Sequence, residues 1–238
     1  MSFRLQVLYE DNHCLAVAKP AGLLTMGDAT GDTTLLEHAK AYIQQKYQKP
    51  GAVFLGVVHR LDRPVSGVVL FARTSKAASR LSEQFREHRI EKVYWAVVAG
   101  TVTPVQGELV QELEKNPSTN VVHVVDRATA RSQPCRLNYR KLAQYRAVSL
   151  IEVRPETGRS HQIRVQLAHQ GWPIVGDRKY GGPPDFTAGQ IALHARALTF
   201  DHPTQHTPTT VQCAPPATWK QWSFPVDGAS SSFENSNS

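Results

Sequence analysis

The chain has 238 residues, of which 41% are hydrophobic, enough for one sizeable core or two small ones tightly joined. No apolar run is long enough to cross a bilayer, and the N-terminus lacks the charged-then-apolar pattern of a signal peptide, so we expect a soluble, cytoplasmic protein. The net charge of +7 and the pI of about 9.5 suit a polyanionic partner, such as nucleic acid or an anionic membrane surface.

The first hundred residues predict strands interrupted by two amphipathic helices. The strand-like segments are short apolar runs at 5–9, 14–18, 53–58, 68–72 and 93–98. A helix over 35–43 has Thr33 or Thr34 as its candidate N-cap. A second helix follows the fourth strand, with Ser75 as its candidate N-cap. Its apolar stripe consists of Ala78, Leu81 and Phe85.

The rest of the chain predicts four more strands, one helix and a tail. The strands lie near 107–113, 121–125, 128–139 and 147–153. A turn then leads into a helix near His161, with Ser160 as its candidate N-cap and Gly171 placed to end it. Residues 226–238 are rich in Ser, Asn and Gly, a composition that predicts a disordered tail.

The order of these elements indicates the fold class. Strands outnumber helices and often follow one another directly along the chain. That order favours an α+β domain with a mixed, largely antiparallel central β-sheet, flanked by helices and loops, over alternating βαβ units.

The segment 59–67 is the most informative for function, because it puts one carboxylate between two arginines just before a turn. Asp62 lies between the strands predicted at 53–58 and 68–72, so rigid elements hold it while a loop exposes it. A neighbouring arginine would keep this carboxylate ionised. Two interpretations stay open at this level: Asp62 reacts with a substrate, or it only hydrogen-bonds its own turn.

Several kinds of site lack their sequence signals. There is no Gly-rich phosphate loop, dinucleotide fingerprint or metal-ligand cluster. No pair of the three scattered cysteines has zinc-ligand spacing, and their odd number argues against a disulfide framework. We expect Cys14 to be a small buried hydrophobe. Asp62 comes too early for a protein-kinase catalytic loop, and Ser66 lacks the nucleophile-elbow pattern of a serine hydrolase.

A glycoside- or phosphate-processing hydrolase is a further alternative. It would need a second carboxylate or a metal site. Asp177 is the candidate worth testing, although we interpret it as structural and expect its mutation to lower stability before it affects chemistry.

A series of motifs resembles the RluA-type pseudouridine synthases. In order they are Lys19–Gly22, His59–Asp62 with Ser66 and Gly67, Lys92–Gly100, Thr157–Arg164, Pro173–Asp177 with Tyr180 and Gly181, Leu193–Ala195, and His202 with Pro203. The resemblance covers roughly residues 5–212. It implies one catalytic domain over 1–225, without the extra N-terminal RNA-binding domain of some relatives.

The resemblance also implies an activity: isomerisation of uridine to pseudouridine in ribosomal or transfer RNA, with no cofactor and no metal. It implies Asp62 as the essential carboxylate, either as nucleophile at the sugar C1′ or as base at C2′. Tyr94 would lie on the flipped uracil and assist proton removal from C5, and Arg164 would pair with Asp62. The implied RNA or substrate contacts are His59, Arg60, Arg159, His161 and Gln162.

Some points depart from this pattern or stay open. Val65 stands where the family usually has Thr, which puts a hydroxyl contact in doubt. His161 and Gln162 are equally plausible as structural hydrogen-bonders. We expect a monomer that takes a uridine from a loop or bulge, because flipping costs least where a base is unpaired. The alternative is a catalytically silent RNA-binding relative, against which the presence of Asp62, Tyr94 and Arg164 argues.

Overall fold

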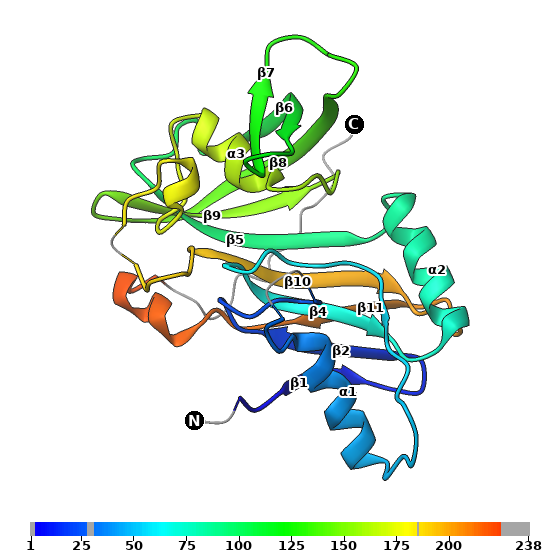
Figure 1. Cartoon of the computed structure of the whole chain (residues 1–238). Coiled ribbons are helices and arrows are strands. Elements are labelled where there is room, and N and C mark those ends of the chain that lie inside the picture. Colours follow the sequence, from blue (N-terminus) through cyan, green and yellow to red (C-terminus); the bar gives the residue numbers. More distant parts are fainter. Residues whose placement is uncertain (1–2, 28–30, 185, 225–238) are drawn as a thin grey trace.

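The computed structural model describes residues 3–27, 31–184 and 186–224. Within this part of the chain, eleven strands form one mixed sheet that three α-helices flank (Figure 1). The predicted α+β fold with a mixed, largely antiparallel sheet is confirmed. The predicted tail, residues 226–238, lies outside the described residues.

The strands follow the order β1-β2-β4-β10-β5-β9-β8-β6-β7, with β3 beside β4 and β11 beside β10. Their bounds are β1 Gln6–Glu10, β2 Cys14–Lys19, β3 Gly56–Val57, β4 Ser66–Ala72, β5 Glu91–Ala99, β6 Gln106–Asn116, β7 Val121–Val125, β8 Gln133–Tyr145, β9 Val148–Pro155, β10 Leu193–Asp201 and β11 Pro208–Gln212. The β4–β10 pair is parallel, and the other pairs of the described sheet are antiparallel.

The β4–β10 pair depends on a glycine. Gly67 has φ +124°, and a Cβ atom there would lie 2.3 Å from the carbonyl oxygen of Ala195. No side chain fits in that space, so glycine lets the two strands approach closely directly after the Asp62 turn.

Strand β4 is buried on both faces because helices cover it from opposite sides. Val69 and Phe71 share a core cluster with residues of α1 (Leu35–Lys46). Val68 and Leu70 belong to another core cluster, with residues of α2 (Ser75–Arg86). The uninterrupted apolar sequence of this strand therefore reflects two packed faces, and the Asp62 turn is anchored directly to it.

The helix starts confirm one predicted cap and correct two. Thr34 caps α1 in a capping box with Glu37, as one of the two predicted candidates. The cap of α2 is Thr74 and not Ser75, since the Thr74 hydroxyl accepts the N–H of Ala77. Ser160 does not cap α3 (Gln162–His169), because that role falls to His161, in a left-handed conformation and without a side-chain cap bond.

The remaining boundaries differ modestly from the predictions. Gly171, with φ +80°, follows the last turn of α3 as expected. The predicted strand at 53–58 is reduced to Gly56–Val57, and Phe54 is 53% exposed before it. The strand predicted at 128–139 begins only at Gln133 and continues to Tyr145.

Candidate active site

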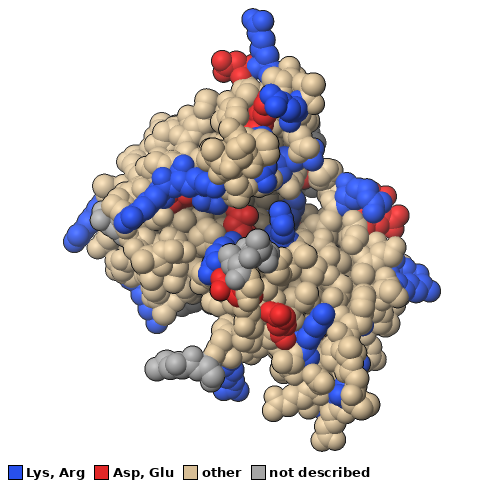
Figure 2. All heavy atoms as spheres, in the orientation of Figure 1, with Lys and Arg blue, Asp and Glu red and all other residues tan. Residues whose placement is uncertain are grey.

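A cavity of about 530 Å³ lies beside the Asp62 turn. Its walls come from five parts of the chain: 58–65, the end of α2 and the residues after it, β5, the segment 155–164, and Leu193 at the start of β10. On the face shown in Figure 2, a hollow near the middle has basic and acidic atoms at its edge. Segments far apart in sequence thus meet at one concave site.

Asp62 is held by the backbone of its own turn and by Thr25. The Val65 N–H donates to the Asp62 carbonyl at 3.1 Å. The Thr25 hydroxyl donates to the Leu61 carbonyl at 3.0 Å and accepts the Leu61 N–H at 3.2 Å. The carboxylate itself stays 33% exposed and lines the cavity. The turn is therefore fixed while its acidic group stays accessible.

Lys19 is a buried lysine that contacts the Asp62 turn, and the sequence did not predict that its ammonium would hold this turn in place. Its ammonium donates to the carbonyls of Pro20, Leu23 and Arg63 at 2.6–3.1 Å, which ties the segment after β2 to the Asp62 turn. Burial lowers the pKa of Lys19 to about 7, although the charge of Asp62 opposes this shift. The Lys-Pro-x-Gly motif was the available signal, but only the fold reveals these three acceptors.

Arg164 of α3 forms the predicted pair with Asp62, its Nη1 lying 3.2 Å from Oδ2. The same guanidinium also makes two bonds to Asp177, of 2.6 Å from Nε and 2.8 Å from Nη2. Burial lowers the pKa of Arg164, but its bonds to Asp177 and Asp62 outweigh that effect and raise it overall. Asp177, 1% exposed, therefore fixes the arginine that faces Asp62.

The two oxygens of the Asp62 carboxylate have different surroundings. Oδ2 faces Arg164 and also Nε2 of His161, at 3.7 Å. Among the described residues, no hydrogen bond reaches Oδ1. Oδ1 is therefore the oxygen that can accept further hydrogen bonds.

Tyr94 and Lys92 of β5 both line the cavity, as residues two apart on a strand face the same side. Burial raises the pKa of Tyr94, and the charge of Asp62 raises it further, so the phenol is neutral. Burial lowers the pKa of Lys92 to about 8. Its ammonium donates to the Thr157 carbonyl at 3.2 Å.

His59 has a structural bond although it lines the cavity. Its Nε2 accepts the Leu70 N–H at 2.9 Å, and its ring stacks on Phe85 with centroids 4.8 Å apart. Burial lowers the pKa of His59 to about 4, so the ring is neutral. Arg60, by contrast, is exposed at the cavity and has the freedom to reach a ligand.

Gln162 is occupied inside the protein. Its Oε1 accepts the Thr157 hydroxyl at 2.8 Å and the Arg159 N–H at 3.1 Å, and its Nε2 donates to the Arg136 carbonyl at 3.0 Å. These bonds favour the structural alternative for Gln162. Arg159 donates through Nε to the Pro134 carbonyl at 3.3 Å while lining the cavity.

The residues after Asp62 are packed into the sheet. Val65 is 3% exposed and belongs to the main core, although it also touches the cavity wall. The Ser66 hydroxyl donates to Nδ1 of His194 at 2.8 Å, since Nε2 of that ring donates to the Cys213 carbonyl at 2.9 Å. Burial lowers the pKa of His194 to about 4, which keeps the imidazole neutral.

Comparison with known proteins agrees with this geometry. The family model described as RNA pseudouridylate synthase matches residues 13–169. The chain belongs to this family. As a member of the RNA pseudouridylate synthase family, it is 34% identical to tRNA pseudouridine synthase C of Pectobacterium carotovorum subsp. carotovorum, over 91% of this chain and 60% of the relative. It is 32% identical to tRNA pseudouridine synthase C of Yersinia pestis, over 96% and 91% of the two chains.

Another relative and two solved structures extend the comparison. Ribosomal large subunit pseudouridine synthase D of Xylella fastidiosa is 35% identical, over 87% of this chain and 65% of the relative. The chain thus spans less than two thirds of this relative and of the Pectobacterium one. Human RNA pseudouridylate synthase domain containing 4 has the same fold, with a TM-score of 0.75 at 23% identity over 89% of each chain. Human RNA pseudouridylate synthase domain containing 1 has a TM-score of 0.71 at 25% sequence identity, over 90% of this chain and 84% of the other.

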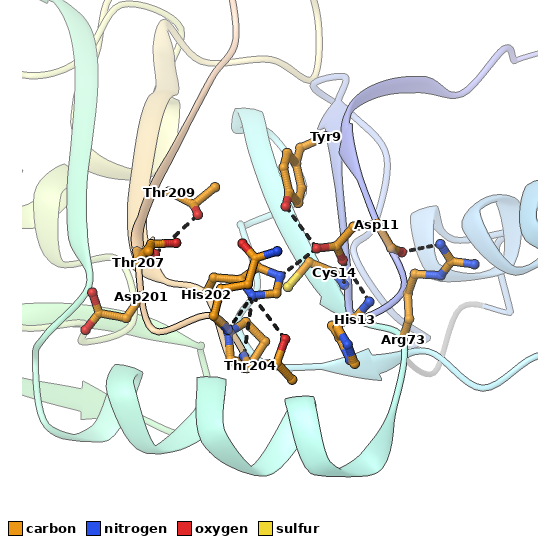
Figure 3. A network of polar contacts seen from close by, with 12 residues as sticks. Tyr9, Asp11, His13, Cys14, Arg73, Asp201, His202, Thr204, Thr207 and Thr209 are labelled. Atoms are coloured by element: carbon orange, nitrogen blue, oxygen red, sulfur yellow. Dashed lines mark hydrogen bonds and ion pairs between the residues drawn. The ribbon is translucent and has the colours of Figure 1, made fainter.

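Away from the cavity of this family member, the fold brings together three ligand-type side chains, Asp11, Cys14 and His202 (Figure 3). The sequence had shown no metal-ligand cluster, because His202 is far along the chain from Asp11 and Cys14. Nδ1 of His202 accepts the Gln205 N–H at 3.1 Å, so the ring proton is on Nε2, which donates to Oδ2 of Asp11 at 2.5 Å. Nε2 could ligate a metal ion only after giving up this proton and its bond to Asp11.

This cluster is better described as a clamp between two turns. The other oxygen of Asp11 accepts the N–H groups of His13 and Cys14, each at 2.7 Å, and the Tyr9 hydroxyl donates to Oδ2 at 2.9 Å. Cys14 is fully buried, as predicted, and burial raises the pKa of its thiol to about 12. We call Tyr9, Asp11 and His202 the turn clamp.

Many of the basic residues either pair with carboxylates or line the cavity. Several arginines form ion pairs with nearby carboxylates: Arg89, Arg131, Arg136, Arg140 and Arg154. The arginines and the lysine that line the cavity are Arg60, Arg86, Lys92, Arg159 and Arg164. The positive charge relevant to a bound ligand therefore lies around Asp62.

Proposed function

We propose that this protein isomerises uridine to pseudouridine in RNA, with Asp62 as its essential carboxylate. The observation that carries the proposal is the Asp62–Arg164 pair at the wall of a cavity that also contains Tyr94. The guanidinium of Arg164 lies 3.2 Å from Oδ2 and so places a positive charge beside this carboxylate. Family membership supplies the reaction that such a site would perform.

In this reaction the bond from N1 of uracil to C1′ of the sugar breaks, the base turns, and a bond from C5 to C1′ forms. The C5 proton is lost and N1 gains one, so no oxidant or reductant is needed. Asp62 would act through Oδ1, either by attacking C1′ or by taking the proton at C2′. Oδ2 would stay bound to Arg164 throughout.

Tyr94 is proposed to lie against the flipped uracil. A flat, amphipathic ring suits an extruded base. Because burial keeps the phenol neutral, Tyr94 is a weak base. It would assist removal of the C5 proton only by giving up its own hydroxyl proton in the same step.

The substrate is proposed to be a uridine in a loop or bulge of transfer or ribosomal RNA, where base flipping costs least. Relatives named for tRNA and for the ribosomal large subunit support both classes of RNA. Arg60, Arg86 and Arg159 would contact phosphates at the cavity. We further propose that the protein is a monomer and acts in the cytoplasm. Within the described residues, no helix is long and apolar enough to span a bilayer.

The test is tritium release from RNA made with 5-³H-uridine, followed by mapping of pseudouridine in the product. We expect release by the wild type and none above background by Asp62→Asn. Asp201→Asn is the matched control, since it makes the same chemical change at a half-exposed carboxylate that does not line the cavity. RNA binding without release by the wild type would instead identify a catalytically silent relative.

A further inference from the structure

His161 lies beside Asp62 in an unusual conformation. Its backbone has φ +55°, in the left-handed region, and its side chain is only 8% exposed. Such a conformation in a residue other than glycine is uncommon and often marks a functional site. Here it directs the ring between the Tyr180 hydroxyl, 2.7 Å from Nδ1, and the Asp62 carboxylate, 3.7 Å from Nε2.

The hydrogen bonds around Tyr180 are compatible with one tautomer of His161 that faces Asp62. The Tyr180 oxygen accepts the Val122 N–H at 3.0 Å, and its own hydroxyl proton can be donated to Nδ1 of His161 at 2.7 Å. Nδ1 then acts as an acceptor, and the proton of the neutral ring is on Nε2. This N–H faces Oδ2 of Asp62.

Burial supports a neutral ring at this position. It lowers the pKa of His161, while the charges of Asp62 and Asp177 oppose the shift and those of Arg164 and Lys179 reinforce it. At neutral pH His161 is therefore a hydrogen-bond donor and carries no charge.

We propose that His161, with its tautomer set by Tyr180, is a positioning residue that closes on Oδ2 of Asp62 when substrate binds. The inference rests on the proposed function. At 3.7 Å the contact is too long for a hydrogen bond, but such contacts often tighten when substrate is bound. Two donors on one oxygen, from His161 and Arg164, fix the rotation of the carboxylate and direct Oδ1 toward the sugar.

Two substitutions of His161 separate this role from simple space filling. Glutamine places an amide N–H as many bonds from Cβ as Nε2 of histidine, so it reaches Asp62. Asparagine is one bond shorter and reaches only toward Tyr180. Both residue types tolerate the conformation: Gln48 of this chain has φ +48° and Asn120 has φ +53°.

The experiment measures single-turnover tritium release from 5-³H-uridine RNA at saturating enzyme, together with the Kd for the same RNA. We expect His161→Gln to stay within about threefold of the wild-type rate and His161→Asn to fall about tenfold to a hundredfold, the effect of losing one bond to a charged group. The Kd should change less than about twofold in both variants, because the contact acts on Asp62 and not on RNA.

Tyr180→Phe provides an independent test of the tautomer. The rate should fall about tenfold in the wild-type background, since Nε2 loses its fixed proton, but little further in the His161→Gln background, where no tautomer exists. Equal rates for the Gln and Asn variants, or full additivity of Tyr180→Phe, would overturn the role of His161. An inactive wild type would instead refute the proposed function itself.

Discussion

The cavity and the turn clamp are built from similar groups but differ in what remains open. In the clamp, both oxygens of Asp11 accept hydrogen bonds from the protein, and His202 is engaged through both ring nitrogens (Figure 3). In the cavity, Asp62 has bonds to one oxygen, and the carboxylate is 33% exposed. The hydrogen bonds of Asp11 are all made within the protein and connect two turns, whereas Asp62 keeps one oxygen available to a ligand in the cavity.

A second contrast lies within the cavity itself. Asp177 binds Arg164 through two short bonds and is 1% exposed, while Asp62 binds the same guanidinium through one longer bond. Asp177 therefore fixes the position of Arg164, and Arg164 contacts Asp62 at the cavity. We expect the largest loss of stability from a substitution of Asp177.

Asp177→Asn should lower the free energy of unfolding by about 3–5 kcal/mol, because it leaves the buried guanidinium of Arg164 without its main partner. Urea denaturation followed by circular dichroism measures this change. Asp201→Asn, half-exposed, should change stability by less than about 0.5 kcal/mol. A loss below about 1 kcal/mol for Asp177→Asn would contradict the description of a buried pair.

Asp11→Asn should lower the free energy of unfolding by about 2–3 kcal/mol, since the clamp loses charged hydrogen bonds to backbone N–H groups and to His202. Tyr9→Phe, which removes one of these donors, should cost about 1 kcal/mol. Both values come from the same denaturation experiment. If added Zn²⁺ raised the melting temperature of the wild type but not of Asp11→Asn, the clamp would instead be a metal site.

Acid should weaken the fold through His194, whose pKa is about 4 in the folded chain and about 6.5 when unfolded. Between these values the unfolded chain binds more protons, so stability falls as pH falls through this window. From pH 7 to pH 5 the share of His194 is about 2 kcal/mol, and His59 acts in the same direction. His194→Gln should reduce this difference in urea denaturation; an unchanged pH dependence would refute the assignment.

The smallest effect is expected at the outer edge of the cavity. Arg60 is exposed there. Arg60→Ala should reduce the slope of log Kd for RNA against log salt concentration by about one, the value expected for the loss of one phosphate contact. Fluorescence anisotropy over a salt series measures it. Lys220→Ala, an exposed cation that does not line the cavity, should leave the slope unchanged.

Local sequence patterns predicted much of this architecture. The strand at 121–125 and the Thr34 cap are formed by side chains that act on their own segment, so the sequence was sufficient. The cap of α2 was missed by one residue because Thr74 and Ser75 are both good cap residues, and only the fold selects between them.

The candidate site shows where such patterns stop being informative. Asp62, Tyr94 and Arg164 were selected from motifs, and they line the same cavity. The support from Asp177 and Lys19 depends on bonds between distant segments, which no local pattern encodes. His161, and not the predicted Ser160, takes the N-cap position of α3 in a left-handed conformation, and its ring contacts Tyr180, a residue of a distant segment.

The most direct test compares Asp62→Asn with Asp11→Asn by two measurements on each variant: the single-turnover rate of pseudouridine formation and the midpoint of thermal unfolding. We predict that Asp62→Asn loses about 10⁴-fold in rate and keeps its midpoint, whereas Asp11→Asn keeps its rate while folded and melts at a lower temperature. A rate for Asp62→Asn within tenfold of the wild type would contradict the claim that the Asp62 carboxylate performs the chemistry.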